Sequence, residues 1–316
     1  MGAYLFMTET ITIAHISDVH LSPLTGFTPR HWNAKRALGF VNWHRKRRHI
    51  HLRSVADRLI ADMKLQTPDH IALTGDLINI GLPAEYEAAA RWLQRVGPPS
   101  GLSIVPGNHD IYTHLKSDPG VARWNAYMAS DDWGLAQGGS AIGGFPYVRR
   151  VGPVAIVGLC SAVPTAPGIA IGRLGQTQLA EVKQLLDGLG RAGVFRLVMI
   201  HHPPLPGQAR ANHDLTDASD MAEILANAGA ELVLHGHNHR PMAASVAFAG
   251  GVSRVIGVAS ASANRVHGRE PRARYNLITI TGTARNWQIH LRQRGLASDD
   301  DGIVELENGR LDRTAG

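Results

Sequence analysis

The sequence predicts an α/β sandwich in which two β-sheets are covered by helices on their outer faces. Short apolar, strand-like runs recur along the 316 residues, and in the earlier part of the chain they alternate with segments of helical periodicity. Helix-like segments lie near residues 53–66, 84–96 and 176–190. The strand-like runs lie near residues 9–16, 70–74, 101–105, 146–150, 154–160, 194–200, 231–235, 252–259, 274–281 and 285–293.

The last helix-like segment shows the helical pattern most clearly. Between residues 177 and 189, apolar side chains recur at three- and four-residue intervals, which places them on one face of a helix. We expect this face to pack on the core rather than to bind a partner. Its apolar members are Leu179, Val182, Leu185, Leu186 and Leu189.

Metal-ligand side chains follow four of the strand-like runs. Asp18 comes after the run 11–16 and Asp76 after the run 71–73, and His201 and His237 follow runs 197–200 and 232–234 in the same way. Alternate residues of an extended chain face the same side, so two pairs, Asp18 with His20 and His237 with His239, can each reach one site. The sequence therefore predicts that these ligands gather along one edge of a sheet.

Each of these short motifs has an ordinary structural explanation when it is taken alone. Gly-Asp is a common turn, and a histidine after a strand is more often hydrogen-bonded than bound to metal. Together, seven oxygen and nitrogen donors after successive buried runs predict two metal sites. These candidate ligands are Asp18, His20, Asp76, Asn108, His201, His237 and His239.

The ordered set resembles the calcineurin-like metallophosphoesterase superfamily, whose motifs are Asp-x-His, Gly-Asp, Gly-Asn-His-Asp/Glu, His and Gly-His-x-His. The matching segments here are 18–20, 75–76, 107–110, 201 and 236–239. The resemblance implies a four-layer α/β/β/α sandwich of two mixed sheets. It also implies that Asp18, His20 and His239 bind one metal, that Asn108, His201 and His237 bind the other, and that Asp76 bridges both. His109 would protonate the leaving group.

The expected chemistry is hydrolysis of a phosphoester P–O bond by a hydroxide shared between two divalent ions. Two such ions carry four positive charges, and the carboxylates of Asp18 and Asp76 neutralise two of them. The remaining positive charge attracts an anionic phosphoryl group. Imidazole, carboxylate and carboxamide donors suit manganese, iron, zinc or cobalt, among which the sequence does not choose.

Three functional hypotheses follow. The motif context is similar to the class III cyclic nucleotide phosphodiesterase group, which includes enzymes for cyclic nucleotides and glycerophosphodiesters, so a phosphodiesterase acting on a small substrate is preferred. The alternative is a peripheral-membrane pyrophosphohydrolase or phosphodiesterase with a lipid-linked substrate such as UDP-diacylglucosamine. A non-catalytic binding scaffold is the third, and the complete ligand set argues against it.

The charge distribution bears on the second hypothesis. The net charge is +6, and the stretch from Leu21 to Ala56 has eight Lys and Arg residues and no Asp or Glu. Trp32 and Trp43 lie within it, and tryptophan and basic residues together favour an anionic lipid surface. A solvated basic loop is the ordinary interpretation, an anionic membrane contact through residues 30–53 is the alternative, and nucleic acid binding is not expected.

The ligands span more than 200 positions, so residues 9–295 are predicted to form one metallophosphoesterase domain with a basic insert at about 21–53. An N-terminal extension, 1–8, would precede it, with Met7 as a second start, and a flexible tail or edge hairpin, 296–316, would follow. Cys160 is the single cysteine and there is no long apolar stretch, so we expect a cytoplasmic protein, at most peripheral to the inner face of the membrane. The oligomeric state is left open.

Two loops are candidates for substrate contacts. Residues 163–175 are rich in Pro and Gly, and residues 203–215 follow His201 directly. Binding residues often lie on such loops beside a rigid scaffold. The candidates are Arg173, Arg210 and His213.

Overall fold

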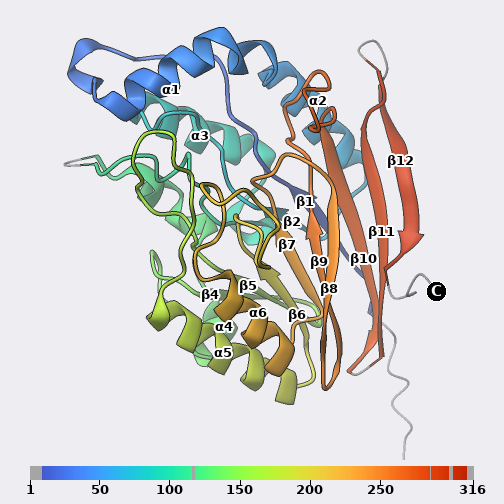
Figure 1. Ribbon diagram of the computed structural model, residues 1–316. Coiled ribbons are helices and arrows are strands. Elements are labelled where there is room, and N and C mark those ends of the chain that lie inside the picture. Colours follow the sequence, from blue (N-terminus) through green and yellow to red (C-terminus); the bar gives the residue numbers. More distant parts are fainter. Residues whose placement is uncertain (1–8, 116–117, 285, 299–301, 312–316) are drawn as a thin grey trace, which may run out of the picture.

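A computed structural model of the protein describes residues 9–115, 118–284, 286–298 and 302–311. Two six-stranded sheets pack face to face at its centre, and helices cover their outer faces (Figure 1). This arrangement confirms the predicted α/β/β/α sandwich. The expected N-terminal extension, 1–8, lies outside the described residues.

The first sheet is mixed, with a parallel half and an antiparallel half. Its order is β12-β11-β10-β1-β2-β3. The parallel strands are β1 (Ile11–Ile16), β2 (His70–Leu73) and β3 (Leu102–Ile104). The antiparallel strands are β10 (Arg274–Thr283), β11 (Asn286–Leu296) and β12 (Ile303–Arg310).

The second sheet is parallel except at its two edges. Its order is β4-β5-β6-β7-β9-β8. The parallel strands are β5 (Val154–Gly158), β6 (Phe195–Met199), β7 (Leu232–His235) and β9 (Gly251–Gly257). The antiparallel edges are β4 (Tyr147–Val151) and β8 (Met242–Phe248).

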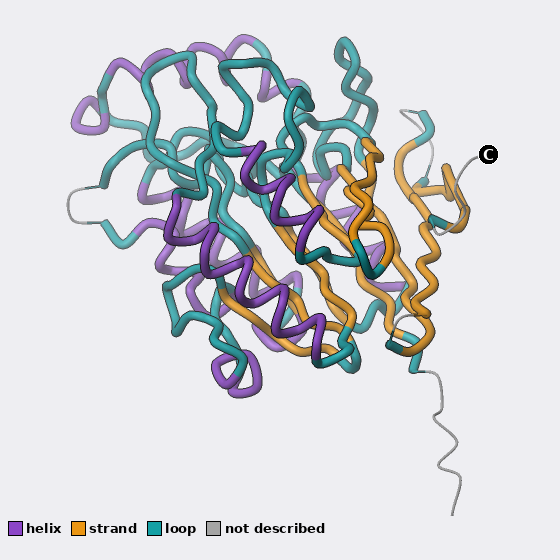
Figure 2. Tube along the Cα trace, turned by 60° about the horizontal axis from the view of Figure 1, so that its bottom comes forward, coloured by secondary structure: helices purple, strands orange, loops and turns teal. Residues whose placement is uncertain are grey.

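The helices lie outside the paired sheets (Figure 2). The α-helices are α1 (Ala34–Arg45), α2 (Arg53–Leu65), α3 (Pro83–Val96), α4 (Asp132–Ala136), α5 (Gln176–Arg191) and α6 (Ala218–Asn227). Short 3₁₀ helices are η1 (Pro29–His31), η2 (Arg47–His49), η3 (Pro99–Gly101) and η4 (Gly120–Tyr127). None of the helices in the described part of the chain combines the length and apolar character that crossing a bilayer requires.

Two apolar layers hold the sandwich together. The larger one joins the facing sides of the two sheets and continues beneath α2 and α3. The smaller one fills the space between the second sheet and helices α5 and α6, and it contains all five apolar residues predicted for the face of α5. Burial of each such side chain contributes about 1.5–3 kcal/mol, which fixes the helices on the sheet.

The basic insert folds into α1, η1 and η2 rather than a solvated loop. Asn33 caps α1, because its side chain accepts a hydrogen bond from the Arg36 backbone N–H at 2.8 Å. Arg36 is buried and donates to the carbonyl groups of Ile80 and Gly81 in the loop after β2. The insert is therefore attached to a segment that carries a candidate metal ligand.

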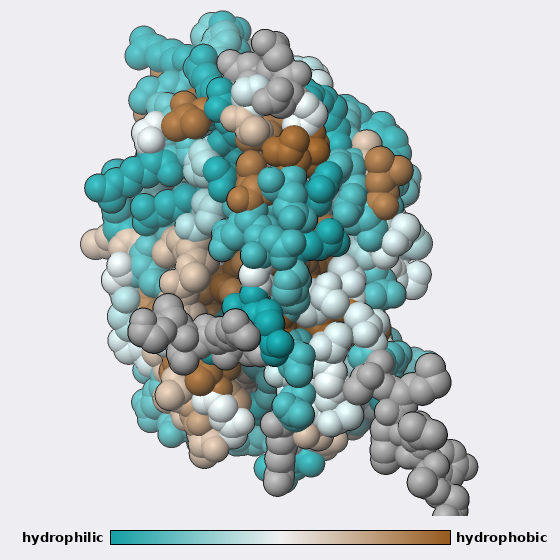
Figure 3. Space-filling model, turned by 90° about the vertical axis from the view of Figure 1, so that its right-hand side faces the viewer, coloured by the Kyte–Doolittle hydropathy of each residue, from teal (hydrophilic) through white to brown (hydrophobic). Residues whose placement is uncertain are grey.

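The C-terminal strand β12 forms the outer edge of the first sheet. It pairs with β11 over residues 303–310, with one irregularity between Gln293 and Arg294. The face of the molecule that presents this edge is mostly hydrophilic, with apolar residues in small separate patches (Figure 3). This edge carries exposed charged side chains, those of Glu305, Glu307 and Arg310. Charged side chains on an edge strand disfavour its pairing with a strand of another molecule.

Candidate functional site

The first group of candidate ligands lies where β1 and β7 end. The His239 Nε2 atom is 3.3 Å from Asp18 Oδ1 and 3.2 Å from His20 Nε2. His20 Nε2 is in turn 3.8 Å from Asp76 Oδ2. Two atoms that share one ion through bonds of about 2.1 Å lie about 3.0–3.4 Å apart, so the two distances from His239 fit one metal, whereas the His20–Asp76 distance is longer.

The second group lies beside the first, with Asp76 between them. His201 Nε2 is 3.5 Å from Asp76 Oδ2, 3.1 Å from Asn108 Oδ1 and 3.3 Å from His237 Nδ1. The structure thus brings all seven predicted ligands together, with Asp76 in contact with both groups. They follow strands of both sheets, so the expectation of a single sheet edge was wrong.

The hydrogen bonds of the four candidate histidines leave one ring nitrogen of each free to bind a cation. His20 and His201 direct Nδ1 to the carbonyl groups of Ile78 and Thr74, at 3.1 and 2.6 Å. His237 directs Nε2 to the His213 carbonyl at 2.9 Å, and His239 directs Nδ1 to a Glu270 carboxylate oxygen at 3.1 Å. A nitrogen facing a carbonyl or carboxylate oxygen carries the proton, so the other nitrogen in each neutral ring presents a lone pair. In the neutral rings these lone pairs converge on two positions, where a metal cation can accept them.

The carboxylates point to the same conclusion. Asp18 Oδ1 is buried and has no hydrogen-bond partner, although Oδ2 accepts from the His237 N–H at 3.1 Å. An unsatisfied buried carboxylate oxygen is costly unless a cation balances it. The donor set and this orphaned oxygen therefore fit two divalent ions.

The raised pKa values of His201 and His239 also indicate that the site favours positive charge. Burial lowers the pKa of His201, but the Asp76 carboxylate outweighs burial and raises the pKa to about 9. In the same way Asp18 and Glu270 overcome burial and raise the pKa of His239 to about 10. Without metal, protons on these imidazoles balance the carboxylates, so metal binding must displace protons.

The backbone at the ligands is strained. The described residues include six non-glycine residues with positive φ, and five are candidate ligands: Asp18, His20, Asp76, His237 and His239, with φ between 43° and 69°. Each such conformation costs about 1–3 kcal/mol and persists where the surrounding structure enforces it, as at functional sites. The residues of the two pairs, Asp18 with His20 and His237 with His239, therefore do not lie in extended backbone, and the strand alternation expected from the sequence is not what brings them together.

Asp110 fixes the loop that bears Asp76. Its carboxylate accepts hydrogen bonds from the backbone N–H groups of Asp76, Leu77, Ile78 and Gly107 at 2.8–3.3 Å. The bonds from Asp76, Leu77 and Ile78 join the Gly-Asp segment to the Gly-Asn-His-Asp segment, and the bond from Gly107 closes the latter segment on itself. The fourth residue of that segment therefore has a structural role, which explains an acid there that does not face the metals.

His109 lies beside the metal ligands without joining them. Its backbone N–H donates to Asp76 Oδ1 at 2.7 Å, and its ring Nδ1 donates to the Asn79 carbonyl. Burial, and then the neighbouring Arg47 guanidinium, lower the pKa of His109 to about 3. In the free protein the imidazole is therefore neutral, with Nε2 available to a substrate.

The geometry supports His201 rather than its neighbour His202 as the ligand. Both ring nitrogens of His202 have partners: Nδ1 lies 2.8 Å from Ser161 Oγ and Nε2 lies 3.2 Å from the Ala170 carbonyl. His201 Nε2 faces Asp76 and Asn108 instead.

The ligands open into a cavity of about 830 Å³. Arg210 and His213, both predicted substrate contacts, line it, together with Arg47, Arg240 and Arg269. Arg173, the third predicted contact, lines a separate cavity of about 760 Å³ with Thr165 and Asp217. The structure therefore does not bring Arg173 to the metal ligands.

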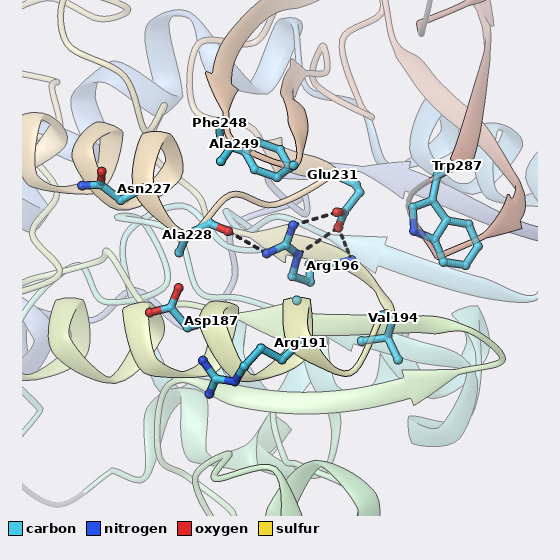
Figure 4. Close-up of a pocket in the computed structure, with 13 residues that line it drawn as sticks. Asp187, Arg191, Val194, Arg196, Asn227, Ala228, Glu231, Phe248, Ala249 and Trp287 are labelled. Carbon is cyan, nitrogen blue, oxygen red and sulfur yellow. Dashed lines mark hydrogen bonds and ion pairs between the residues drawn. The ribbon is translucent and has the colours of Figure 1, made fainter.

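A further cavity, of about 330 Å³, lies between α5, α6 and the β8–β9 turn (Figure 4). Its central cation, Arg196, is satisfied by both carboxylate oxygens of Glu231, at 2.7 and 3.1 Å, and by the Ala228 carbonyl at 2.7 Å. These bonds connect β6 to the segment before β7, so Arg196 has a structural role there.

The sequence did not indicate Glu270. It lies in the loop before β10, 31 positions from His239, and its carboxylate accepts from His239 Nδ1–H at 3.1 Å. A carboxylate in this position orients a ligand imidazole and increases its basicity. Glu270 belongs to no short motif, so only the tertiary structure reveals it.

We expect Glu270→Gln to weaken the metal site at Asp18 selectively. Loss of the carboxylate behind a ligand histidine costs about 10- to 100-fold in metal affinity or activity. Titration of the metal-free protein with manganese, followed by paramagnetic resonance, would show one weakened site and one unchanged site. Glu223→Gln, an exposed change on α6, is the control. Two unchanged sites would show that the contact does not support His239.

Comparisons with known proteins agree with this geometry. Residues 11–241 match the family described as calcineurin-like phosphoesterase. A Synechococcus protein named as a probable cyclic nucleotide phosphodiesterase is 28% identical over 73% of this chain and 74% of its own length. A glycerophosphodiester phosphodiesterase of Enterobacter lignolyticus is 27% identical over 55% of this chain and 57% of its own length.

Solved structures show the same fold at low identity. A dimetal phosphatase from Danio rerio superposes with a TM-score of 0.54 at 14% identity, covering 88% of this chain and 98% of that one. A purple acid phosphatase from yellow lupin also gives 0.54, at 10% identity over 96% of this chain and 54% of that one.

Proposed function

Because the chain belongs to the calcineurin-like phosphoesterase family and is a metal-dependent phosphoric ester hydrolase, we propose that it hydrolyses phosphodiesters, with residues 9–295 as the catalytic domain. The relatives named as phosphodiesterases support this choice of ester. The observation that carries it is the convergence of four imidazole lone pairs and two carboxylates on two adjacent positions.

In this proposal Asp18, His20 and His239 hold one divalent ion, Asn108, His201 and His237 hold the other, and Asp76 bridges them. When bound, the two ions act as Lewis acids toward the phosphoryl oxygens and toward water. Glu270 orients His239, and the carbonyl groups of Ile78 and Thr74 fix the rings of His20 and His201. The chain thereby orients these three rings toward the metal positions.

His109 would serve the leaving group. Its Nδ1–H is held by the Asn79 carbonyl, so Nε2 is the atom that can carry a proton to the departing alkoxide oxygen. The low pKa of the free imidazole leaves Nε2 unprotonated, and an anionic phosphoryl group beside it favours proton uptake. Such proton transfer contributes roughly 10²- to 10⁴-fold in rate.

A substrate panel tests the proposal. The protein is freed of metal, loaded with manganese and assayed with an aryl phosphodiester, cyclic nucleotides, glycerophosphodiesters and matched phosphomonoesters. We expect diesters to be preferred, and cyclic nucleotides or glycerophosphodiesters to be the better natural compounds. Turnover of monoesters alone, or equal turnover in chelated protein, would contradict it.

A lipid-linked substrate is the second candidate, and one surface feature favours it. Trp32, Leu38 and Val41 are 59%, 53% and 45% exposed around α1, beside exposed Arg45 and Lys46. We call these five residues the α1 patch. Exposed apolar residues beside cations fit an anionic bilayer, which would place the protein peripherally on the membrane.

If the α1 patch docks on lipid, replacing Arg45 and Lys46 with Gln should weaken vesicle binding. Each basic residue near an anionic surface contributes about 1 kcal/mol, so the double change should cost roughly 30-fold in partition coefficient at low salt. Co-sedimentation with anionic and neutral vesicles measures it, with Arg91 and Arg95, exposed on α3, replaced by Gln as the control. Equal, negligible sedimentation of the unaltered protein with both vesicle types would remove the lipid hypothesis.

A further inference from the structure

Arg47 is the one member of the basic insert that lines the cavity at the metal ligands. It begins η2, directly after α1, and its Nη1 atom lies 3.2 Å from His109 Nδ1. Its neighbour Arg48 donates instead to His49 at 3.0 Å and does not line this cavity. The guanidinium of Arg47 therefore lies at the site, and that of Arg48 lies outside it.

The turn that carries Arg47 is fixed to the rest of the fold. The Ile50 and His51 N–H groups donate to the Arg47 carbonyl at 3.0 and 2.8 Å. The Leu52 N–H donates to the Ser262 carbonyl, and the Asn264 N–H donates to the Ile50 carbonyl, both at 2.9 Å. His51 is buried and hydrogen-bonded to Ser262 through Nδ1 at 2.9 Å. Arg47 is thus positioned in advance, which reduces the entropy lost when it binds a ligand.

The Arg47 guanidinium has no carboxylate of its own. Within the described residues, no carboxylate oxygen forms an ion pair with it, since Asp18 and Asp76 face the metal positions and Glu270 pairs with His239. Desolvation lowers the pKa of Arg47, but a guanidinium remains charged at any physiological pH. Asp76, Glu270 and Asp18 favour the charge of Arg47 from beyond ion-pair distance, so they offset only part of the desolvation. A buried guanidinium with no directly paired carboxylate, at a site for anions, suits an anionic ligand.

The contact with His109 does not satisfy the guanidinium either. His109 Nδ1 faces the Asn79 carbonyl and therefore carries the ring proton. A protonated nitrogen cannot accept a hydrogen bond from Arg47, so the donors of Arg47 on this side remain available. They lie next to the imidazole that would face the leaving group.

We propose that Arg47 binds a non-bridging oxygen of the phosphoryl group that is hydrolysed. This assignment rests on the proposed phosphodiesterase function and adds to it a phosphate contact supplied by the insert. A planar guanidinium suits two oxygens of one phosphoryl group, whereas an ammonium group offers a single point charge. Arg47 is therefore a substrate-binding residue, distinct from the metal ligands.

The test uses inorganic phosphate as the probe and the manganese-loaded full chain as the protein. Calorimetry gives the phosphate affinity of the unaltered protein and of Arg47→Gln, Arg47→Lys and Arg48→Gln. Loss of a charge-assisted hydrogen bond predicts phosphate binding roughly 10- to 100-fold weaker in Arg47→Gln, with partial recovery in Arg47→Lys. Arg48→Gln, one position away on the same turn, should bind phosphate normally. Metal content and thermal unfolding are measured for every variant.

The outcomes separate this assignment from the proposed function. Equal phosphate affinity in Arg47→Gln and Arg48→Gln overturns the role of Arg47, even if diesters are hydrolysed. Loss of metal or of folding in both Arg47 variants also overturns it, because Arg47 is then structural. If phosphate affinity falls as expected but no diester is hydrolysed, the role of Arg47 stands and the proposed function fails. Failure of the metal-loaded protein to bind phosphate overturns both.

Discussion

Asp76→Asn is expected to lose nearly all diester hydrolysis and to bind metal poorly at both positions. Asp76 Oδ2 lies 3.8 Å from His20 Nε2 and 3.5 Å from His201 Nε2, so one carboxylate serves both groups of ligands. An amide keeps one oxygen but removes a negative charge from between two divalent ions. Mutation of a residue that only orients a metal ligand lowers metal affinity or activity about 10- to 100-fold. Loss of a ligand shared by both ions should therefore lower activity at least about 100-fold.

The measurement for Asp76→Asn is metal content after dialysis, by elemental analysis, together with turnover of an aryl phosphodiester. Asp132→Asn, an exposed change in the first turn of α4, controls for the substitution itself. Asp76 Oδ1 also accepts from the His109 N–H at 2.7 Å, so thermal unfolding of the metal-free proteins is compared as well. Undiminished turnover with two bound metals would refute a bridging role.

His109→Ala should keep both metals and still lose rate. His109 lies beside the ligands and holds Asp76 only through its backbone N–H, which alanine retains. The rate loss should reach roughly 10²- to 10⁴-fold for alkyl leaving groups, and it should shrink for nitrophenolate, which leaves without needing a proton. A plot of rate against leaving-group pKa should therefore be steeper for the variant.

His114→Ala, an exposed change in the same loop, is the control for His109→Ala. If the His109 variant lacks metal, the residue is a ligand or a structural element, and the acid role is wrong. If its rate falls equally for good and poor leaving groups, His109 binds substrate instead of donating a proton.

The sequence predicted that the candidate ligands lie close together because most of them follow buried, largely apolar strands. Runs 71–73 and 232–234 are buried in β2 and β7, and Asp76 and His237 come three positions after their last residues. Local sequence suffices here because strand and ligand are neighbours in the chain. The chosen ligand of the His201-His202 pair agrees with the hydrogen bonding for the same reason.

Helix α1 and strand β8 could not be predicted because the contacts that stabilise them are distant in sequence. Helix α1 buries Lys35 and Arg36 and exposes Leu38 and Val41, which reverses the usual amphipathic pattern. Strand β8 alternates half-buried and exposed residues at the edge of its sheet, a weak signal beside the continuous central strands.

The residues around the ligands show the same limit. Arg47 and Arg48 are identical in type and adjacent in sequence, yet only Arg47 lines the cavity at the ligands. The difference comes from the way η2 meets the loop near Ser262, more than 200 positions away. Charge composition alone assigned both residues to the surface.

The left-handed backbone at five candidate ligands also predicts which substitutions a descendant without the activity would accumulate. Glycine adopts positive φ without the steric penalty of a side chain, so Gly at position 18, 20, 76, 237 or 239 would relieve about 1–3 kcal/mol of strain. The greater freedom of glycine in the unfolded chain offsets about 0.5–1 kcal/mol of this gain. A lineage that abandoned the reaction would find its stabilising mutations at these five codons, whereas random mutation elsewhere mostly destabilises. Loss of function in such descendants should therefore begin as glycine at the metal positions, with the folded sandwich left intact or strengthened.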